Sequence, residues 1–154
     1  MADPLVETWQ INARIDTYLL GALPSPALSA AAASGGRTVG EALAHLHNVR
    51  LMWLRAAAPD LLAGLDKIEK DGGLPASGLA KALDASAAAI TALVARALAE
   101  GGRVKGFKPH VHAFVGYLVS HESHHRGQIL LALKQSGVKL DKKVAYGLWE
   151  WGSR

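Results

Sequence analysis

Apolar residues recur at three- and four-residue intervals along four long stretches of this chain, the spacing of helices with one face turned to a core. The first predicted helix covers residues 3–20, where Asp3 can cap the helix and Pro4 suits its first turn. The second begins at residue 38, because Thr38 and Glu41 have the three-residue spacing of a capping box.

Two more long helices follow after an interruption. Pro59 ends the second helix, and a short helix is predicted over residues 60–69. The third long helix is predicted over residues 79–100 and the fourth over residues 109–135. No stretch shows the alternation of β-branched residues that is typical of a strand. The pattern therefore predicts an all-α fold, a four-helix bundle that forms a single domain of residues 1–154.

Composition and charge exclude several classes of protein. No uninterrupted apolar run is long enough to cross a bilayer, and no secretory signal is evident, so we expect a soluble, cytoplasmic protein. The absence of cysteine excludes disulfides, cysteine nucleophiles and thiolate-ligated metals. The formal net charge of +4 is mild and its basic residues are dispersed, so we expect no nucleic-acid or membrane partner. Small molecules, including anions, are the expected partners.

The segment HESHH, residues 121–125, carries the candidate chemistry. His121 and His125 are four residues apart, so on a helix they project within about 40° of each other and can share one ion. On the helical wheel they lie in the middle of the predicted core stripe, with His124 at its edge and Glu122 and Arg126 pointing further out. Two buried imidazoles need partners for their nitrogens, and one bound metal ion would serve both.

A third ligand is needed, because catalytic zinc sites usually have three protein ligands and one open position. The second predicted helix offers His45 and His47, both on apolar sides, so periodicity does not choose between them. His110 and His112 lie about 14 to 17 Å from His121 along the helix axis, which favours capping or surface roles.

The stretches TVGEALAHLHNVRLMWL and HESHHRGQILLALKQSG together resemble the DinB/YfiT-like superfamily of small bacterial helical proteins. The resemblance implies that the metal ligands are His45, seven residues after Thr38, together with His121 and His125. It also implies a zinc- or nickel-type site between the second and fourth helices, and often a homodimer. Members of the superfamily include thiol S-transferases that use low-molecular-weight thiols, and metal-dependent hydrolases.

These observations predict a divalent-metal-dependent enzyme of the transferase or hydrolase type that acts on a small electrophilic substrate. Three neutral imidazoles leave the ion its full charge, which acidifies a bound water or thiol. Any thiol would have to be a cosubstrate, since the chain has no cysteine. Glu122 and Arg126 are the weaker candidates for catalytic roles.

Two alternatives follow from the same residues. A non-catalytic stress-response protein that binds a metal or small molecule would need a fourth ligand, which His47 or His124 could supply. HESHH also has the pattern of a zincin protease, but zincins pair this helix with a sheet, and none is predicted here. We therefore do not expect a zincin.

The second predicted helix carries apolar residues on both sides, more than one core needs: Val49 and Met52 lie beside His45, and Leu43 and Leu54 lie opposite. This surplus predicts a homodimer. The alternative is that residues 58–75 or the C-terminal tail cover the spare side.

Overall fold

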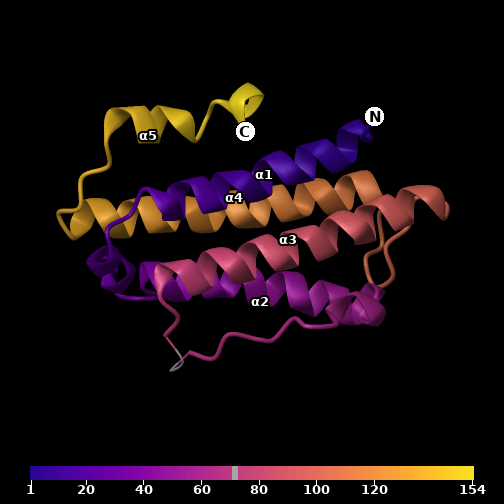
Figure 1. The fold of residues 1–154 in the computed structure, drawn as a ribbon, viewed down its shortest axis with the longest axis horizontal. Coiled ribbons are helices and arrows are strands. Elements are labelled where there is room, and N and C mark those ends of the chain that lie inside the picture. Colours follow the sequence, from indigo (N-terminus) through magenta and orange to yellow (C-terminus); the bar gives the residue numbers. More distant parts are fainter. Residues whose placement is uncertain (71–72) are drawn as a thin grey trace.

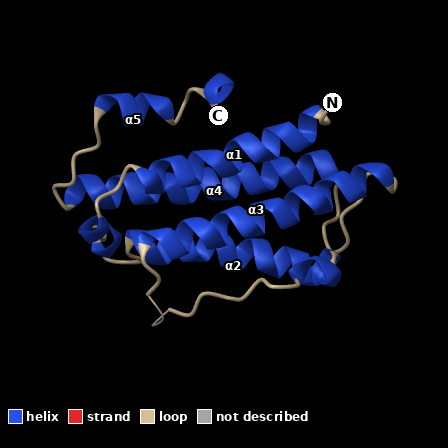
Figure 2. Cartoon of the chain, viewed as in Figure 1, coloured by secondary structure: helices blue, strands red, loops and turns tan. Residues whose placement is uncertain are grey.

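The computed structural model describes residues 1–70 and 73–154, and over these ranges it contains helices and loops but no strand (Figures 1 and 2). Four long helices lie side by side: α1 (Pro4–Gly21), α2 (Val39–Ala57), α3 (Ala76–Ala99) and α4 (Val111–Gln135). The shorter elements are α5 (Lys142–Gly147) and the 3-10 helices η1 (Ser25–Ser29), η2 (Pro59–Leu62) and η3 (Trp151–Ser153). The predicted all-α class with four long helices is confirmed.

Local side-chain caps begin three of the long helices. Asp3 Oδ1 accepts a hydrogen bond from the Leu5 backbone amide at 2.8 Å, at the start of α1. The capping box at α2 is complete, because the Glu41 amide donates to Thr38 Oγ1 at 3.2 Å and the Thr38 amide donates to Glu41 Oε2 at 3.1 Å. His110 caps α4, which confirms the capping role predicted for it. These caps satisfy amides that have no partner within the helix.

The short helix predicted over residues 60–69 is wrong: only the single turn of η2 forms there. Gly64 follows with a positive φ of 76°, a conformation that ends helical geometry. Beyond Gly64, the backbone of Ile68 forms hydrogen bonds with a side chain of α2. Its amide donates to Asn48 Oδ1 and its carbonyl oxygen accepts from Asn48 Nδ2, both at 2.9 Å. The chain around residues 66–68 therefore lies against α2, below it in Figure 1.

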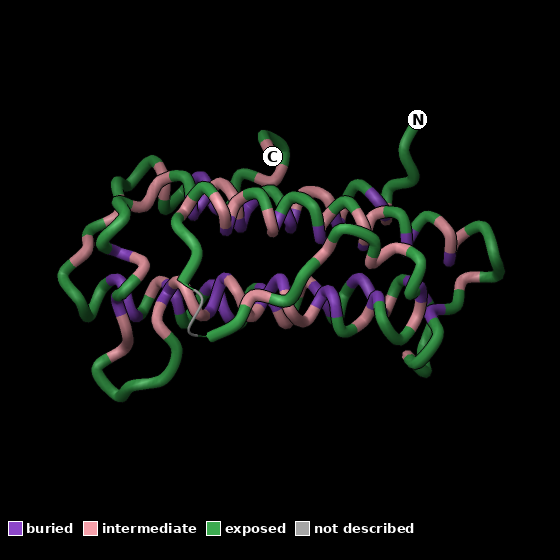
Figure 3. The backbone as a smooth tube through the Cα atoms, turned by 60° about the horizontal axis from the view of Figure 1, so that its bottom comes forward, coloured by how far each residue is buried: buried purple, intermediate pink, exposed green. Residues whose placement is uncertain are grey.

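The long helices bury two groups of apolar residues, one toward each end of the assembly. Buried positions lie on the sides that face the other helices (Figure 3). One group includes Ile15, Leu43, Leu83 and Leu133, and the other includes Trp9, Leu54, Ile90 and Phe114. On α2, α3 and α4 the buried polar residues lie in the chain between these two groups, and on α1 they lie where the two groups meet. They are Asn12, Asp16, His47, Arg50, Ser86, Glu122, His125 and Arg126. The core thus has a polar middle layer.

Within the described ranges, α3 is the one helix long and apolar enough to cross a membrane by length and composition. Its apolar residues pack into both buried groups, through Leu79 and Leu83 at one end and Ile90, Leu93 and Val94 toward the other. Its neighbours in this packing are α1 and α2. These are the contacts of a core helix.

Candidate metal centre

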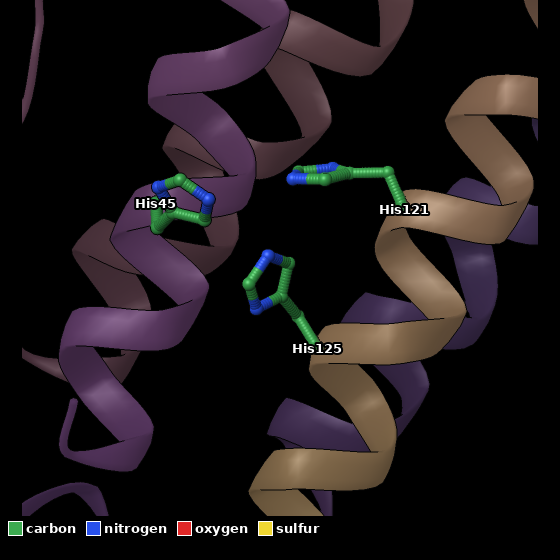
Figure 4. A group of neighbouring side chains, drawn as sticks. All are labelled: His45, His121 and His125. Atoms are coloured by element: carbon green, nitrogen blue, oxygen red, sulfur yellow. The ribbon is translucent and has the colours of Figure 1, made fainter. Parts of the chain in front are cut away.

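Three histidine side chains from two helices converge on one point (Figure 4). His45 comes from α2, and His121 and His125 come from successive turns of α4. One ring nitrogen from each lies within 4.8 Å of the others. The ring centroids of His45 and His125, and of His121 and His125, are 4.6 Å apart, and those of His45 and His121 are 5.3 Å apart. The structure thus brings together the three residues that the resemblance selects.

The donor set suits a borderline divalent ion such as zinc or nickel, which neutral imidazoles bind well. Zinc–nitrogen bonds of about 2.0 to 2.1 Å at tetrahedral angles place the ligand nitrogens about 3.3 Å apart. Side-chain rotations that bring the ring nitrogens about an ångström closer together would therefore let all three bind one ion. His121 Nδ1 is buried and has no hydrogen-bond partner in the described part of the chain. A buried nitrogen without a partner is costly, and a metal ion at this cluster is one way to relieve that cost.

A side-chain contact fixes the tautomer of His125. Its Nδ1 lies 2.9 Å from Gln128 Oε1, and an amide oxygen can only accept, so Nδ1 carries the proton. The Nε2 atom therefore keeps its lone pair for an ion. This is the supporting contact that metal-binding histidines usually make. The Gln128 side chain itself is exposed and does not lie on the buried face of α4.

The surroundings keep all three imidazoles neutral. Burial, followed by the charge of Arg37 and the nearby His125, lowers the pKa of His45 from 6.5 to about 4. Burial is also the largest cause of the lowered pKa values of His121 and His125. Neutral rings have free lone pairs, so the cluster is prepared for a cation.

The other histidines lie apart from this cluster. His47 is buried, with Nδ1 3.1 Å from the Ala82 carbonyl oxygen and Nε2 2.8 Å from the Asp66 carbonyl oxygen. Both of its ring nitrogens are therefore engaged by the backbone. His124 is exposed, and although its ring centroid is 5.0 Å from that of His125, it does not belong to the converging group.

The predicted orientation of α4 is wrong for Glu122 and Arg126. Both were expected to point away from the core, yet their exposed fractions are only 1% and 9%. The buried face runs through Leu118, Glu122 and Ile129, while His121 lies at its margin. Wheel geometry assigned the charged residues to solvent, because their partners on other helices are invisible to periodicity.

Those partners form a buried polar network that joins all four long helices. Arg50 donates to Glu122 Oε1 at 2.7 Å, to Glu122 Oε2 at 3.0 Å and to Asp16 Oδ2 at 2.9 Å. Arg126 donates to Asp16 Oδ1 at 2.7 Å and to Asn12 Oδ1 at 2.9 Å. The network reaches α3 where Arg50 donates to the Leu83 carbonyl oxygen at 2.9 Å. Two guanidinium groups thus face two carboxyl groups in the interior, which limits the cost of burying them.

Ionisation within the network bears on the candidate base. Burial alone would raise the pKa of Glu122, but Arg50 outweighs it and the pKa of this carboxyl is lowered. Burial and the neighbouring Glu122 raise the pKa of Asp16 well above its ordinary value. Asn12 Nδ2 also donates to Glu122 Oε2 at 2.7 Å, so both carboxylate oxygens of Glu122 are occupied. The arrangement gives Glu122 a structural role beside the histidines, since three donors already engage its carboxylate.

A sequence signal for this network existed. Trp9, Asn12 and Asp16 recur at the three- and four-residue intervals that place them on one buried face of α1. Arg50 lies between the buried Leu46 and Leu54 at the same kind of spacing on α2. Polar residues at helical spacing within apolar stripes, with balanced charges on different helices, indicate a buried ion-pair network.

Aromatic side chains border the histidine cluster toward the N-terminal end of α4. Tyr117 stacks on His121, with ring centroids 6.2 Å apart and planes 17° apart. Tyr117 also contacts Trp53 and Phe107, whose centroids lie 5.6 and 5.7 Å from its own. Trp53 is half-buried in this group, and its Nε1 has no partner in residues 1–70 and 73–154.

A cavity of about 980 Å³ opens beside His45, between the beginning of α2 and the beginning of α3. Its lining includes Arg37, Asn48 and Ile68, and His45 belongs both to this wall and to the histidine cluster. The volume is near the upper end of what small-molecule sites usually have. A ligand in this cavity would therefore reach His45, one of the three converging imidazoles.

Comparison with known proteins places this arrangement in a family. The DinB family model matches residues 1–149. The fold is similar to that of a DinB-like protein from Bacillus cereus ATCC 10987, whose crystal structure superposes with a TM-score of 0.65 at 19% identity, covering 89% of this chain and 93% of that one. A search of curated proteins matched none. Since the family match spans nearly the whole sequence, the chain belongs to the DinB family.

Proposed function

We propose that His45, His121 and His125 bind one divalent metal ion, zinc or nickel, and that the protein is a metal-dependent enzyme. The observation that carries this proposal is the convergence of three neutral imidazoles from α2 and α4. A bound ion would acidify a coordinated water or thiol, which is the chemistry of a hydrolase or a thiol S-transferase. The substrate is a small electrophile, and a low-molecular-weight thiol serves as cosubstrate in the transferase case.

The protein groups around the cluster have distinct tasks in this proposal. Gln128 holds the ring of His125 so that Nε2 faces the ion. The contact between Arg50 and Glu122 ties α2 to α4, the two helices that carry the ligands. The aromatic ring of Tyr117 covers one face of His121 and limits the access of water there. Glu122 acts through Arg50 and is not the general base.

The alternative function is a non-catalytic metal- or small-molecule-binding protein of the stress-response type. Such a site would be closed by a fourth protein ligand. His47 is a poor candidate because both ring nitrogens face backbone carbonyl oxygens, and His124 is exposed outside the group of three. Three ligands with an open position favour the enzyme.

Metal analysis of the purified protein tests the site. We expect one zinc or nickel ion per chain, lost in His45→Ala, His121→Ala and His125→Ala but kept in His112→Ala, a matched change at an exposed histidine of α4. Full metal content in the three ligand variants would refute the site.

A second assay separates enzyme from binding protein. The metal-loaded protein is incubated with an aryl halide and with 2-mercaptoethanol, cysteine or water as nucleophile. Turnover that disappears in His125→Ala supports the enzyme, whereas stoichiometric metal without turnover of any electrophile would favour the binding protein.

A further inference from the structure

Charged groups are distributed unevenly around the cavity beside His45. Its apolar wall comprises Leu28, Ala44, Leu74 and Leu79, and its basic residues are Arg37, Lys67 and Lys70. The acidic residues of its lining are Glu41 and Glu69. The basic groups outnumber the acidic ones, so the cavity favours a ligand with a negative charge.

Both acidic side chains already have partners. Glu41 Oε2 accepts from the Thr38 amide at 3.1 Å in the capping box. Glu69 Oε2 lies 3.8 Å from Lys67 Nζ. By contrast, none of the ion pairs formed within residues 1–70 and 73–154 involves Arg37. Lys70 is likewise outside these ion pairs, but of the two only the planar Arg37 guanidinium can donate two parallel hydrogen bonds to one carboxylate.

The positive charge of Arg37 also acts on the histidine cluster. After burial, it is a further cause of the lowered pKa at each of His45, His121 and His125. Arg37 directly precedes Thr38, the residue that caps α2, and His45 lies two turns into the same helix. Arg37 and His45 both line the cavity, so one small molecule there can contact the guanidinium at one end and the His45 ring at the other.

We propose that Arg37 determines substrate specificity by binding a carboxylate, so that the substrate or thiol is a small molecule with an apolar body and a carboxylate end. This inference rests on the proposed metal site, which would hold the reacting group. A planar guanidinium pairs with the two oxygens of a carboxylate through two parallel hydrogen bonds. Leu28, Ala44 and Leu79 contact the carbon body, and the carboxylate fixes which end faces His45.

The test uses two thiols of similar size with the cobalt(II)-loaded protein. Thiolate binding to cobalt is followed by its charge-transfer absorption, for 3-mercaptopropionate and for neutral 2-mercaptoethanol. The measured quantity is the ratio of the affinity for 3-mercaptopropionate to the affinity for 2-mercaptoethanol. We expect this ratio to be about tenfold higher in wild type than in Arg37→Gln, because one charged hydrogen bond at a partly exposed site contributes about that much. Because the ratio is compared between proteins, intrinsic differences between the two thiols cancel.

Control variants separate specificity from general damage. Arg55→Gln removes an exposed arginine from the last turn of α2 and should keep the wild-type preference. Arg37→Gln should keep the circular dichroism of wild type, because Arg37 is exposed. Any loss of affinity that this variant shows for both thiols cancels in the ratio. An equal preference in wild type and Arg37→Gln would overturn the proposal.

A second arm does not depend on the metal. Propionate is titrated into the metal-free protein, and the amide resonances of Thr38 and His45 are followed by NMR. We expect shifts in wild type that are absent in Arg37→Gln. Shifts together with a failure to bind cobalt would refute the metal site and leave the role of Arg37 standing. No difference between the two proteins in this titration would overturn the role of Arg37, whether or not cobalt binds.

Discussion

Arg50 on α2 and Glu122 on α4 form a two-pronged contact, with Nε 2.7 Å from Oε1 and a terminal nitrogen 3.0 Å from Oε2. Both side chains are almost fully buried. Glu122 directly follows His121, and Arg50 lies just over one turn beyond His45, so this pair joins the helices at the level of the histidine cluster. The contact therefore sets the spacing of α2 and α4 where the ligands meet.

Removing one partner should leave the other buried charge with only part of its compensation, which for Arg50 is Asp16 and for Glu122 is Asn12. We expect Glu122→Gln and Arg50→Met each to lower the free energy of unfolding by about 3 to 5 kcal/mol, measured by urea denaturation. The double variant Arg50→Met with Glu122→Gln should lose less than the sum of the two single changes. The exposed pair of Arg96 and Asp60 is the control, and Arg96→Ala should have little effect. Additive losses in the double variant would contradict the coupling.

Stability without metal should depend on pH through the three ligand histidines. Burial, then Arg37 and His125, lowers the pKa of His45 from 6.5 in the unfolded chain to about 4 in the folded one. As pH falls from 6.5 toward 4, His45 becomes protonated in the unfolded chain but stays neutral in the folded one. The unfolded state therefore binds more protons, and the free energy of unfolding should decrease. Chelator-treated protein is unfolded in urea across this window. A variant with all three histidines replaced by Ala should show a shallower decrease, and an identical slope would contradict the prediction.

Metal occupancy should persist to lower pH than three ordinary histidines would allow. Protons compete with the ion for imidazole lone pairs, and the lowered pKa values of His45, His121 and His125 weaken that competition. We expect most of the metal to remain bound at pH 6 and to dissociate at lower pH with a steep dependence on proton concentration. Equilibrium dialysis against buffered zinc measures this. Half-loss of metal at or above pH 6.5, the unshifted value, would show that burial does not protect the site.

The contact between Gln128 and His125 should affect metal affinity more than folding. Gln128→Leu removes the acceptor for His125 Nδ1, which frees the tautomer and ring orientation. We expect metal affinity to fall by about 10- to 100-fold with a small change in thermal stability of the metal-free protein. Ser123→Ala, at another exposed position of α4, should change neither quantity. Unchanged affinity in Gln128→Leu would remove this residue from the site.

The homodimer remains a prediction, and fewer apolar side chains of α2 are exposed to support it than the sequence suggested. Leu43 and Leu54 are buried within the chain, and residues Asp66 and Ile68 bond to the side of α2 that carries His47 and Asn48. The large apolar side chain left on α2 is Met52, with an exposed fraction of 49%.

Analytical ultracentrifugation at micromolar concentration checks this association. If Met52 lies in a dimer contact, Met52→Lys should shift the protein toward monomer, because the contact would then bury a charge. Arg55→Gln, one turn of α2 away, is the control. A monomeric wild type would refute the dimer.

Local interactions made some features predictable from the sequence alone. The capping box of Thr38 and Glu41 depends only on residues three apart, so the start of α2 could be placed to the residue. The shared direction of His121 and His125 follows from the geometry of one helix. The periodicity of apolar residues likewise fixed the all-α class, because it requires no knowledge of which helices meet.

Contacts between distant segments decided the rest. Periodicity left His45 and His47 equivalent, and they are distinguished only because carbonyl oxygens of Asp66 and Ala82 engage His47 while His45 meets α4. The helical wheel assigned Glu122 to solvent, whereas the fold buries it and supplies Arg50, 72 residues away in the sequence, to pair with it. A buried charge is stable only beside its partner, and that partner's position is a property of the tertiary structure.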